Sequence, residues 1–122
     1  MKDWVTGKML PLKHGFLYLA NLNPSRGSEA GKIRPVLVIQ NDLLNERLHP
    51  STWVLPCTSQ VLGSDLLRVT LPQGIAGNER ECEILIDQSR AIDNRRILKE
   101  LEELPSILLA EVKEKLKLLG DL

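Results

Sequence analysis

The chain has 122 residues, 43% of them hydrophobic, and its 16 basic and 16 acidic side chains give a net charge of zero. A chain of this length and composition buries its own core as one domain, which excludes a disordered protein. Neutrality excludes bulk affinity for nucleic acid, and an aromatic content of 3% argues against a stacking platform for single strands. Residues 1–60 nevertheless hold seven Lys or Arg against four Asp or Glu, so a local basic surface is compatible with the composition.

Five short stretches predict β-strands from their apolar alternation or β-branched content, namely residues 15–22, 35–40, 52–57, 66–71 and 83–89. Pro35 suits the first position of the second strand, where a missing N–H is tolerated, and Pro56 predicts a bulge or an edge in the third. Five short strands joined by loops favour a small barrel or sandwich.

The C-terminal third is rich in helix formers. Propensity predicts a helix over residues 95–104, with sequence RRILKELEEL, and Pro105 suits the first turn of a separate helix over 105–119. The second helix carries one apolar stripe, which we expect to face the core. The stripe consists of Leu109, Val112, Leu116 and Leu119.

The two cysteines, Cys57 and Cys82, are 25 positions apart, a spacing that fits no metal site. Each lies in strand-like sequence, and we expect both to fill the core as small hydrophobic residues. No apolar run reaches the roughly 18 residues that span a membrane, and the N-terminus has no apolar signal core. These features predict a cytoplasmic protein that does not contact a membrane.

Three motifs occur in a fixed order: NLNPSRGSEAGKIRPVLVIQND (21–42), PCTSQ (56–60) and ILIDQSRAID (84–93). Through them the chain resembles the MazF/PemK family of toxins from type II toxin–antitoxin modules. The resemblance implies a mainly β fold with a C-terminal helix (α+β), an SH3-like small barrel of the MazF/PemK/CcdB type. Residues 15–122 would form the single toxin domain. Residues 1–14 would form an N-terminal extension, part of which can be disordered. The resemblance also implies that residues 95–104 form a strand, against their helix propensity.

The resemblance implies a toxin that is a homodimeric, sequence-selective endoribonuclease (an mRNA interferase). It would cleave single-stranded RNA by 2′-hydroxyl attack, with no metal and no other cofactor. A cognate antitoxin would cover the RNA groove with an extended acidic segment. Two alternatives remain open: a gyrase-poisoning toxin of the same fold, and an inactive homologue that only binds antitoxin or RNA. The two histidines, His14 and His49, match no motif, and we expect both at the surface.

Three residues are candidates for catalysis. Arg34 resembles the family's catalytic arginine, and its permanently charged fork suits a phosphate that gains negative charge; it could instead hold the loop through a carboxylate. Thr58 resembles the family's catalytic threonine and can donate its hydroxyl to a phosphate oxygen. Asp87 is the best carboxylate for a general base, although it could equally orient Arg34 or Arg90. Glu29 is a weaker candidate for the base.

RNA contacts are expected from the first loop and from the two later motifs. The expected residues are Arg26, Ser28, Glu29, Lys32, Gln60, Gln88 and Arg90. Four cations, Arg26, Lys32, Arg34 and Arg90, would then form one basic groove for RNA phosphates or antitoxin carboxylates. The alternative is that these charges lie apart and are balanced by Glu29 and Asp87.

Overall fold

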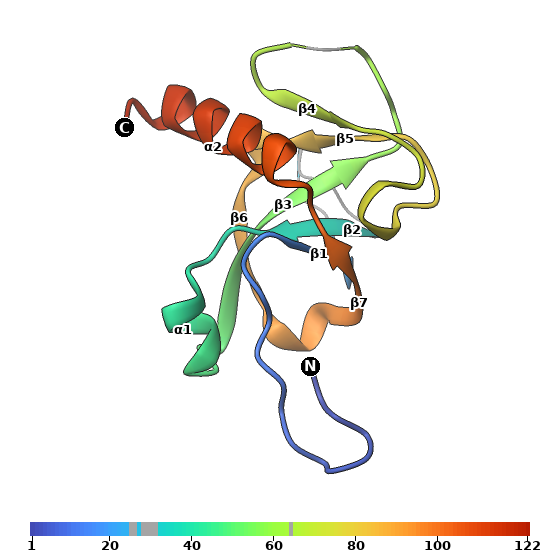
Figure 1. Ribbon diagram of the computed structural model, residues 1–122, viewed down its shortest axis with the longest axis vertical. Helices are drawn as coiled ribbons and strands as arrows, with labels where there is room; N and C mark the ends of the chain where they lie inside the picture. The colour runs from blue at the N-terminus through green and yellow to red at the C-terminus, as the bar shows by residue number, and fades with distance from the viewer. Residues whose placement is uncertain (25–26, 28–31, 64) are drawn as a thin grey trace.

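The computed structural model describes residues 1–24, 27, 32–63 and 65–122 (Figure 1). The described residues form seven strands: β1 (Phe16–Asn21), β2 (Ile33–Val38), β3 (Ser51–Thr58), β4 (Arg68–Leu71), β5 (Cys82–Leu85), β6 (Arg90–Asp93) and β7 (Ile97–Glu103). They also form two α-helices, α1 (Asp42–Glu46) and α2 (Ser106–Gly120), and three 3-10 turns, η1 (Ile75–Gly77), η2 (Ile86–Gln88) and η3 (Asn94–Arg96). The predicted mainly β architecture with a C-terminal helix is confirmed.

The strands form an antiparallel sheet in the order β4-β5-β3-β2-β1-β7, and β6 pairs with β3 outside this path. On the edge of β3 that faces away from β2, residues 51–54 pair with β6 and residues 57–58 pair with β5. Pro56 lies in the interval between these two ladders, where its missing N–H removes no hydrogen bond on that edge. Of the two predicted alternatives, a bulge or an edge, the edge is wrong because β3 lies inside the sheet.

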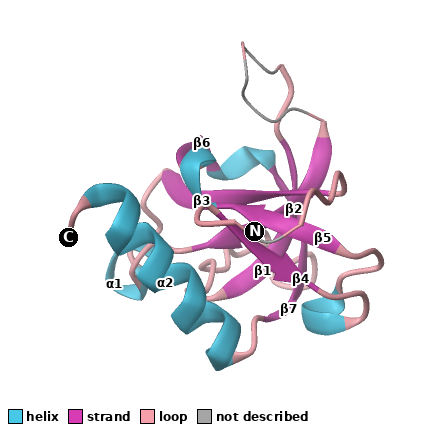
Figure 2. Ribbon diagram, turned by 90° about the horizontal axis from the view of Figure 1, so that it is seen from above, coloured by secondary structure: helices cyan, strands magenta, loops and turns pink. Residues whose placement is uncertain are grey.

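The central strands are apolar on both faces because each face meets its own core. Neighbouring residues of a strand point to opposite faces of the sheet. Leu37 of β2 therefore lies in one buried cluster, called the first cluster, and Val36 and Val38 lie in the other, called the second cluster. Cys57 and Cys82 are both buried in the first cluster, which confirms their predicted core role. Helix α2 covers this cluster and lies along one flank of the strands (Figure 2).

Helix α2 confirms part of the predicted apolar stripe. Val112 is fully buried, and Leu109 and Leu116 pack against the first cluster. Leu119 is 46% exposed, so its predicted place in the core is wrong. The last turn of α2 therefore extends beyond the sheet it covers.

The segment rich in helix formers, residues 95–104, is a strand over most of its length. Strand β7 pairs with β1 along the edge of the sheet, with Leu19 opposite Lys99 and Phe16 opposite Glu103. Tertiary pairing thus overrides propensity, and the expectation from the family resemblance is confirmed. The predicted strand over 83–89 is too long, because β5 ends at Leu85 and the chain turns through η2 before β6.

Residues 1–14 precede the sheet as a loop at the lower edge of Figure 1. An isolated bridge between Lys2 and Met9 closes the loop, and the N-terminal amino group donates to the Leu10 carbonyl at 3.0 Å. Leu12 is buried and joins the second cluster, which anchors the end of the loop. Within the described ranges, no helix is long and apolar enough to cross a membrane.

Candidate functional site

A cavity of about 550 Å³ lies where β2 begins and β3 ends. The two strands are antiparallel, with Val36 opposite Pro56, so the start of one lies beside the end of the other. Arg34 and Thr58 both line this cavity, although they are 24 positions apart in the sequence. The polar or charged residues that concern its chemistry are Lys32, Arg34, Thr58, Gln60, Glu79, Arg80 and Lys99.

Arg34 is half-buried at the floor of the cavity. Its Nη1 donates a hydrogen bond of 3.1 Å to the carbonyl oxygen of Cys57, the residue that precedes Thr58. The guanidinium is therefore held against the end of β3, one residue before Thr58, which lines the same cavity. A guanidinium carries five N–H donors and a permanent charge, so it can also bind an anion in the cavity.

Thr58 is only 9% exposed, and its side-chain oxygen accepts a hydrogen bond of 3.2 Å from the backbone N–H of Gln60. A hydroxyl has one hydrogen to donate and two lone pairs. Because Gln60 uses a lone pair, the hydrogen of the Thr58 hydroxyl is available for a ligand oxygen. Arg34 and Thr58 thus provide a charge and a directed donor in one cavity.

Lys32 stands at the rim of the cavity in a left-handed conformation, with φ at 68°. Such a φ is unfavourable for a residue with a side chain, and two hydrogen bonds hold it. The Lys32 N–H donates to Oδ1 of Asn23 at 2.7 Å, and its carbonyl accepts from Leu22 N–H at 2.8 Å. Arg96 of η3 adds hydrogen bonds to the carbonyls of Asn21 and Asn23, so the turn before β7 helps fix the approach to β2.

Two cations in the cavity wall, Arg80 and Lys99, were missed by the sequence reasoning. Lys99 lies on β7, opposite Leu19 of β1, and Leu101 lines the same cavity. The alternation of residues 97, 99 and 101 could have indicated Lys99, once the segment was taken as a strand. Arg80 comes from the loop before β5, and no local pattern indicates that this loop reaches the start of β2.

Cys57 and Cys82 both line the cavity and belong to the same buried cluster. A hydrogen bond donated to Cys82, together with burial, raises the pKa of the Cys57 thiol well above its usual range. Cys57 therefore stays a neutral thiol at physiological pH, and neither cysteine is exposed enough to act as a nucleophile on a large substrate.

Residues of the third motif lie elsewhere. Asp87 and Gln88 are on η2 and Arg90 begins β6, which pairs with the opposite half of β3 from Thr58. None of the three lines the cavity of a single chain. Their roles stay predictions. Of the four expected groove cations, the structure brings together Lys32 and Arg34; Arg26, with Ser28 and Glu29, lies outside the described residues.

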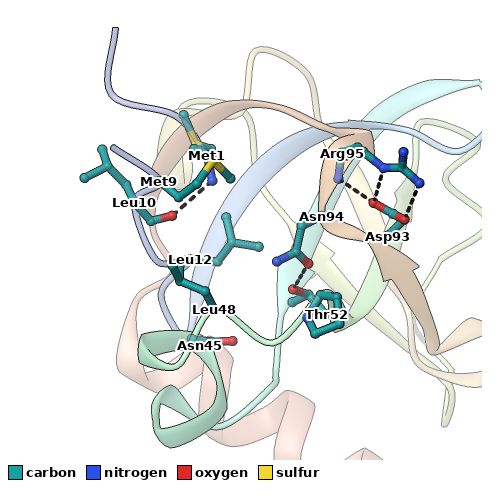
Figure 3. A pocket seen from close by; sticks show the side chains of 11 residues that line it. Met1, Met9, Leu10, Leu12, Asn45, Leu48, Thr52, Asp93, Asn94 and Arg95 are labelled. Atoms are coloured by element: carbon teal, nitrogen blue, oxygen red, sulfur yellow. Dashed lines mark hydrogen bonds and ion pairs between the residues drawn. The ribbon is translucent and has the colours of Figure 1, made fainter. Parts of the chain in front are cut away.

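A second cavity, of about 400 Å³, lies between the N-terminal loop and the segment from α1 to β3 (Figure 3). Its apolar wall includes Met1, Met9, Leu10, Leu12 and Leu48. Its polar side chains already bind one another: Thr52 donates to Asn94 at 2.6 Å, and Asp93 pairs with Arg95 at 2.9 Å. No predicted site residue lines it. In the part of the chain that the structure describes, no group of three or more His, Cys, Asp or Glu side chains could hold a metal ion.

The mainly β fold and the first cavity together place an arginine and a threonine at one strand junction. A sequence profile described as "PemK-like, MazF-like toxin of type II toxin-antitoxin system" matches residues 13–120. The chain belongs to this family.

Named relatives and solved structures agree with this assignment. The chain is 38% identical over 108 residues to Endoribonuclease EndoA of Bacillus subtilis, which covers 88% of this chain and 92% of the relative. It is 32% identical over 115 residues to Endoribonuclease MazF9 of Mycobacterium tuberculosis, covering 91% and 98%. The crystal structure of MazF from Deinococcus radiodurans superposes with a TM-score of 0.81 and 31% identity, covering 93% of this chain and 100% of that one. A MazE–MazF complex from the same organism superposes with a TM-score of 0.72 and 32% identity, covering 91% and 98%.

Proposed function

We propose that the chain is a sequence-selective, metal-independent endoribonuclease toxin that cleaves single-stranded mRNA in the cytoplasm. The observation that carries the proposal is the contact of Arg34 with the Cys57 carbonyl, which holds a guanidinium one residue before Thr58 in the cavity that both side chains line. Relatives at 32–38% identity are named endoribonucleases, which supports the same activity here.

The proposed reaction is attack of the ribose 2′-oxygen on the adjacent phosphorus. The 2′-oxygen gives its proton to a base and bonds to phosphorus, and the bond to the 5′-oxygen breaks. The products are a 2′,3′-cyclic phosphate and a 5′-hydroxyl, which takes its proton from water. Arg34 stabilises the charge that grows on the phosphate oxygens, and Thr58 donates its hydroxyl to one of them. Because these two donors stabilise the negative charge of the phosphate, the proposed reaction needs no metal ion.

The proposed base is a carboxylate, and two residues compete for the role. Asp87 was predicted from its motif, but it can serve only if a second copy of the chain brings it to the cavity. Glu79 is exposed and lines the cavity of the same chain as Arg34. The two assignments are separable by mutation, because Asp87 and Glu79 lie on different elements.

RNA would be held by the cations around the cavity. Lys32, Arg80 and Lys99 are exposed at its wall and suit phosphates on either side of the cleaved bond. Gln60 has an exposed amide that can hydrogen-bond a base edge. We retain Arg26, Ser28, Glu29, Gln88 and Arg90 as proposed RNA contacts.

The proposed partner is a cognate antitoxin, bound to a toxin homodimer. Solved MazE–MazF complexes share this fold, and the cations of the cavity would accept the carboxylates of an extended acidic segment. An antitoxin that occupies the cavity must compete with RNA, and higher salt must weaken both ligands.

Cleavage of a defined single-stranded RNA in EDTA tests the proposal. The expected result is cleavage at preferred sequences, with 2′,3′-cyclic phosphate ends. Gyrase–DNA adducts with intact RNA would instead identify a gyrase poison, and an inert protein that binds antitoxin or RNA would identify an inactive homologue.

A further inference from the structure

A buried carboxylate lies behind the candidate site and has no part in the proposed reaction. Glu83 is fully buried in the middle of β5, opposite Thr58 on one side and Thr70 on the other. Residues that face each other across antiparallel strands point to the same face. Thr58 and Glu83 therefore share one face of the sheet, opposite the face that holds Cys57 and Ile84.

Glu83 forms an ion pair with Arg68 of β4, and both side chains bind the segment that follows Thr58. Oε1 of Glu83 accepts from Nη1 of Arg68 at 2.8 Å and from the backbone N–H of Leu62 at 2.9 Å. The same Nη1 donates to the carbonyl oxygen of Gln60 at 3.1 Å. The ion pair thus fixes one backbone acceptor and one backbone donor of residues 60–62.

These contacts reach the Thr58 hydroxyl in one further step. Gln60 accepts from Arg68 through its carbonyl and donates from its N–H to the Thr58 oxygen. If the backbone at Gln60 moved, the hydrogen bond that orients the Thr58 hydroxyl would be lost. The path from Glu83 to Thr58 therefore runs through three hydrogen bonds, none longer than 3.2 Å.

A contribution to folding stability does not by itself explain why Arg68 and Glu83 form a buried ion pair. Two buried charges lose their hydration, and apolar side chains of similar volume commonly stabilise such a site as well or better. Burial favours the neutral form of Glu83, but the Leu62 N–H and Arg68 outweigh it and lower the pKa of the carboxyl. Glu83 is therefore ionised at neutral pH and keeps Arg68 in place.

We propose that Arg68 and Glu83 are positioning residues, which hold residues 60–62 so that the Thr58 hydroxyl and Gln60 face the RNA. The inference rests on the proposed function, since it assigns these residues a role in RNA cleavage. Neither residue lines the cavity or touches the substrate. Their effect passes through the backbone of Gln60 and Leu62.

The decisive variant is the double substitution Arg68→Met with Glu83→Leu, which replaces the ion pair by apolar side chains. The expected protein folds with a Tm near or above that of wild type, because no charge is left buried without a partner. Its kcat should fall about tenfold or more, because small displacements of catalytic groups cost up to about a hundredfold. KM should change much less than kcat, because the cations of the cavity remain.

Amide hydrogen exchange gives a readout that is independent of activity. The Leu62 N–H should exchange slowly in wild type and faster in the double variant, which has no acceptor for it. The matched control is Arg95→Met, which removes an ion pair to Asp93 that is exposed and distant from the cavity. This control should leave kcat within about twofold of wild type, because exposed pairs contribute little.

The positioning role is wrong if the folded double variant cleaves within about twofold of wild type, or if its Leu62 exchange is unchanged. Should the double variant not fold, Glu83→Gln keeps the shape and an acceptor for Leu62 but removes the charge that holds Arg68. A kcat for Glu83→Gln equal to that of wild type would then overturn the proposal. Absence of RNA cleavage by wild type itself would instead overturn the proposed function, whatever the exchange data show.

Discussion

Arg34 donates a hydrogen bond from Nη1 to the carbonyl oxygen of Cys57, and this 3.1 Å contact joins the start of β2 to the end of β3. It places a permanent positive charge one residue from Thr58, whose hydroxyl proton is available for a ligand oxygen. Because strands position side chains more rigidly than loops, the charge and the donor are preorganised for an anion.

The Thr58 hydroxyl should contribute to the rate rather than to folding. We expect Thr58→Ala to lower kcat by about a hundredfold to a thousandfold, in the range found for loss of one preorganised donor. Thr58→Ser retains the hydroxyl and serves as the matched control, with most of the activity preserved. Single-turnover cleavage of a defined RNA measures the effect. Equal losses in Ala and Ser variants would assign Thr58 a packing role instead.

Arg80 and Lys99 should bind RNA phosphates. An ionic contact with single-stranded nucleic acid contributes about 0.7 to the slope of log K against log salt concentration. We expect Arg80→Gln and Lys99→Gln each to weaken binding and to reduce that slope by about this amount. The ligand is RNA with a 2′-deoxy sugar at the cleaved position, which cannot react.

Lys113 provides the control for these two variants, because it is exposed on α2 and does not line the cavity. Lys113→Gln should leave the salt slope unchanged. A slope that changes equally in all three variants would mean that the cavity has no special affinity for phosphates.

The identity of the base should follow from two neutral substitutions. If Glu79 removes the proton of the 2′-hydroxyl, Glu79→Gln lowers kcat strongly and Asp87→Asn does not. If Asp87 acts from a second copy of the chain, the order reverses, and mixing inactive Asp87→Asn with inactive Arg34→Ala should restore some activity through mixed dimers. The measurement is kcat as a function of pH, since loss of a base removes the lower limb of the profile. Full activity of both variants would exclude both carboxylates.

The sequence predicted those strands whose hydrophobic pattern agrees with their burial in the fold. Residues 16–21 and 33–38 are strands because their apolar side chains meet a core on one face or both. Residues 97–103 show the limit of local propensity, because pairing with β1 decides their conformation. Helix α1 was not predicted, although Asn41 caps it by accepting from the Leu43 N–H at 2.8 Å.

The site was predicted in part, and only through the family resemblance. No local sequence pattern indicates that Arg34 and Thr58 line one cavity. The family motifs in which they occur implied that both belong to the same site. Arg80 and Lys99 could not be expected, because the approach of the loop before β5 and of β7 to β2 depends on the tertiary fold. The family motifs assigned Asp87 to the same site as Arg34. In a single chain, however, Asp87 lies on η2 and does not line the cavity.

The exposed pair at η3 should show a pH dependence of defined sign. A hydrogen bond from Arg95 is the main cause that lowers the pKa of Asp93 from 3.8 to about 2. A lowered pKa contributes stability that is fully present above pH 3.8 and is lost as the pH falls toward 2. We expect Arg95→Met to raise the Asp93 pKa toward its usual value, as measured by NMR titration of the carboxyl. An unchanged pKa would show that the backbone N–H of residue 95 alone holds the carboxylate.

Cleavage of single-stranded RNA by Arg34→Ala, measured beside wild type in EDTA, tests the central claim most directly. We predict that wild type cleaves without metal and that the variant, at unchanged Tm and oligomeric state, loses about a hundredfold or more of kcat. The reason is that Arg34 is the guanidinium held on the Cys57 carbonyl, one residue before Thr58, in this cavity. Cleavage by Arg34→Ala within a few-fold of wild type, or an absolute need of wild type for Mg²⁺, would contradict the account.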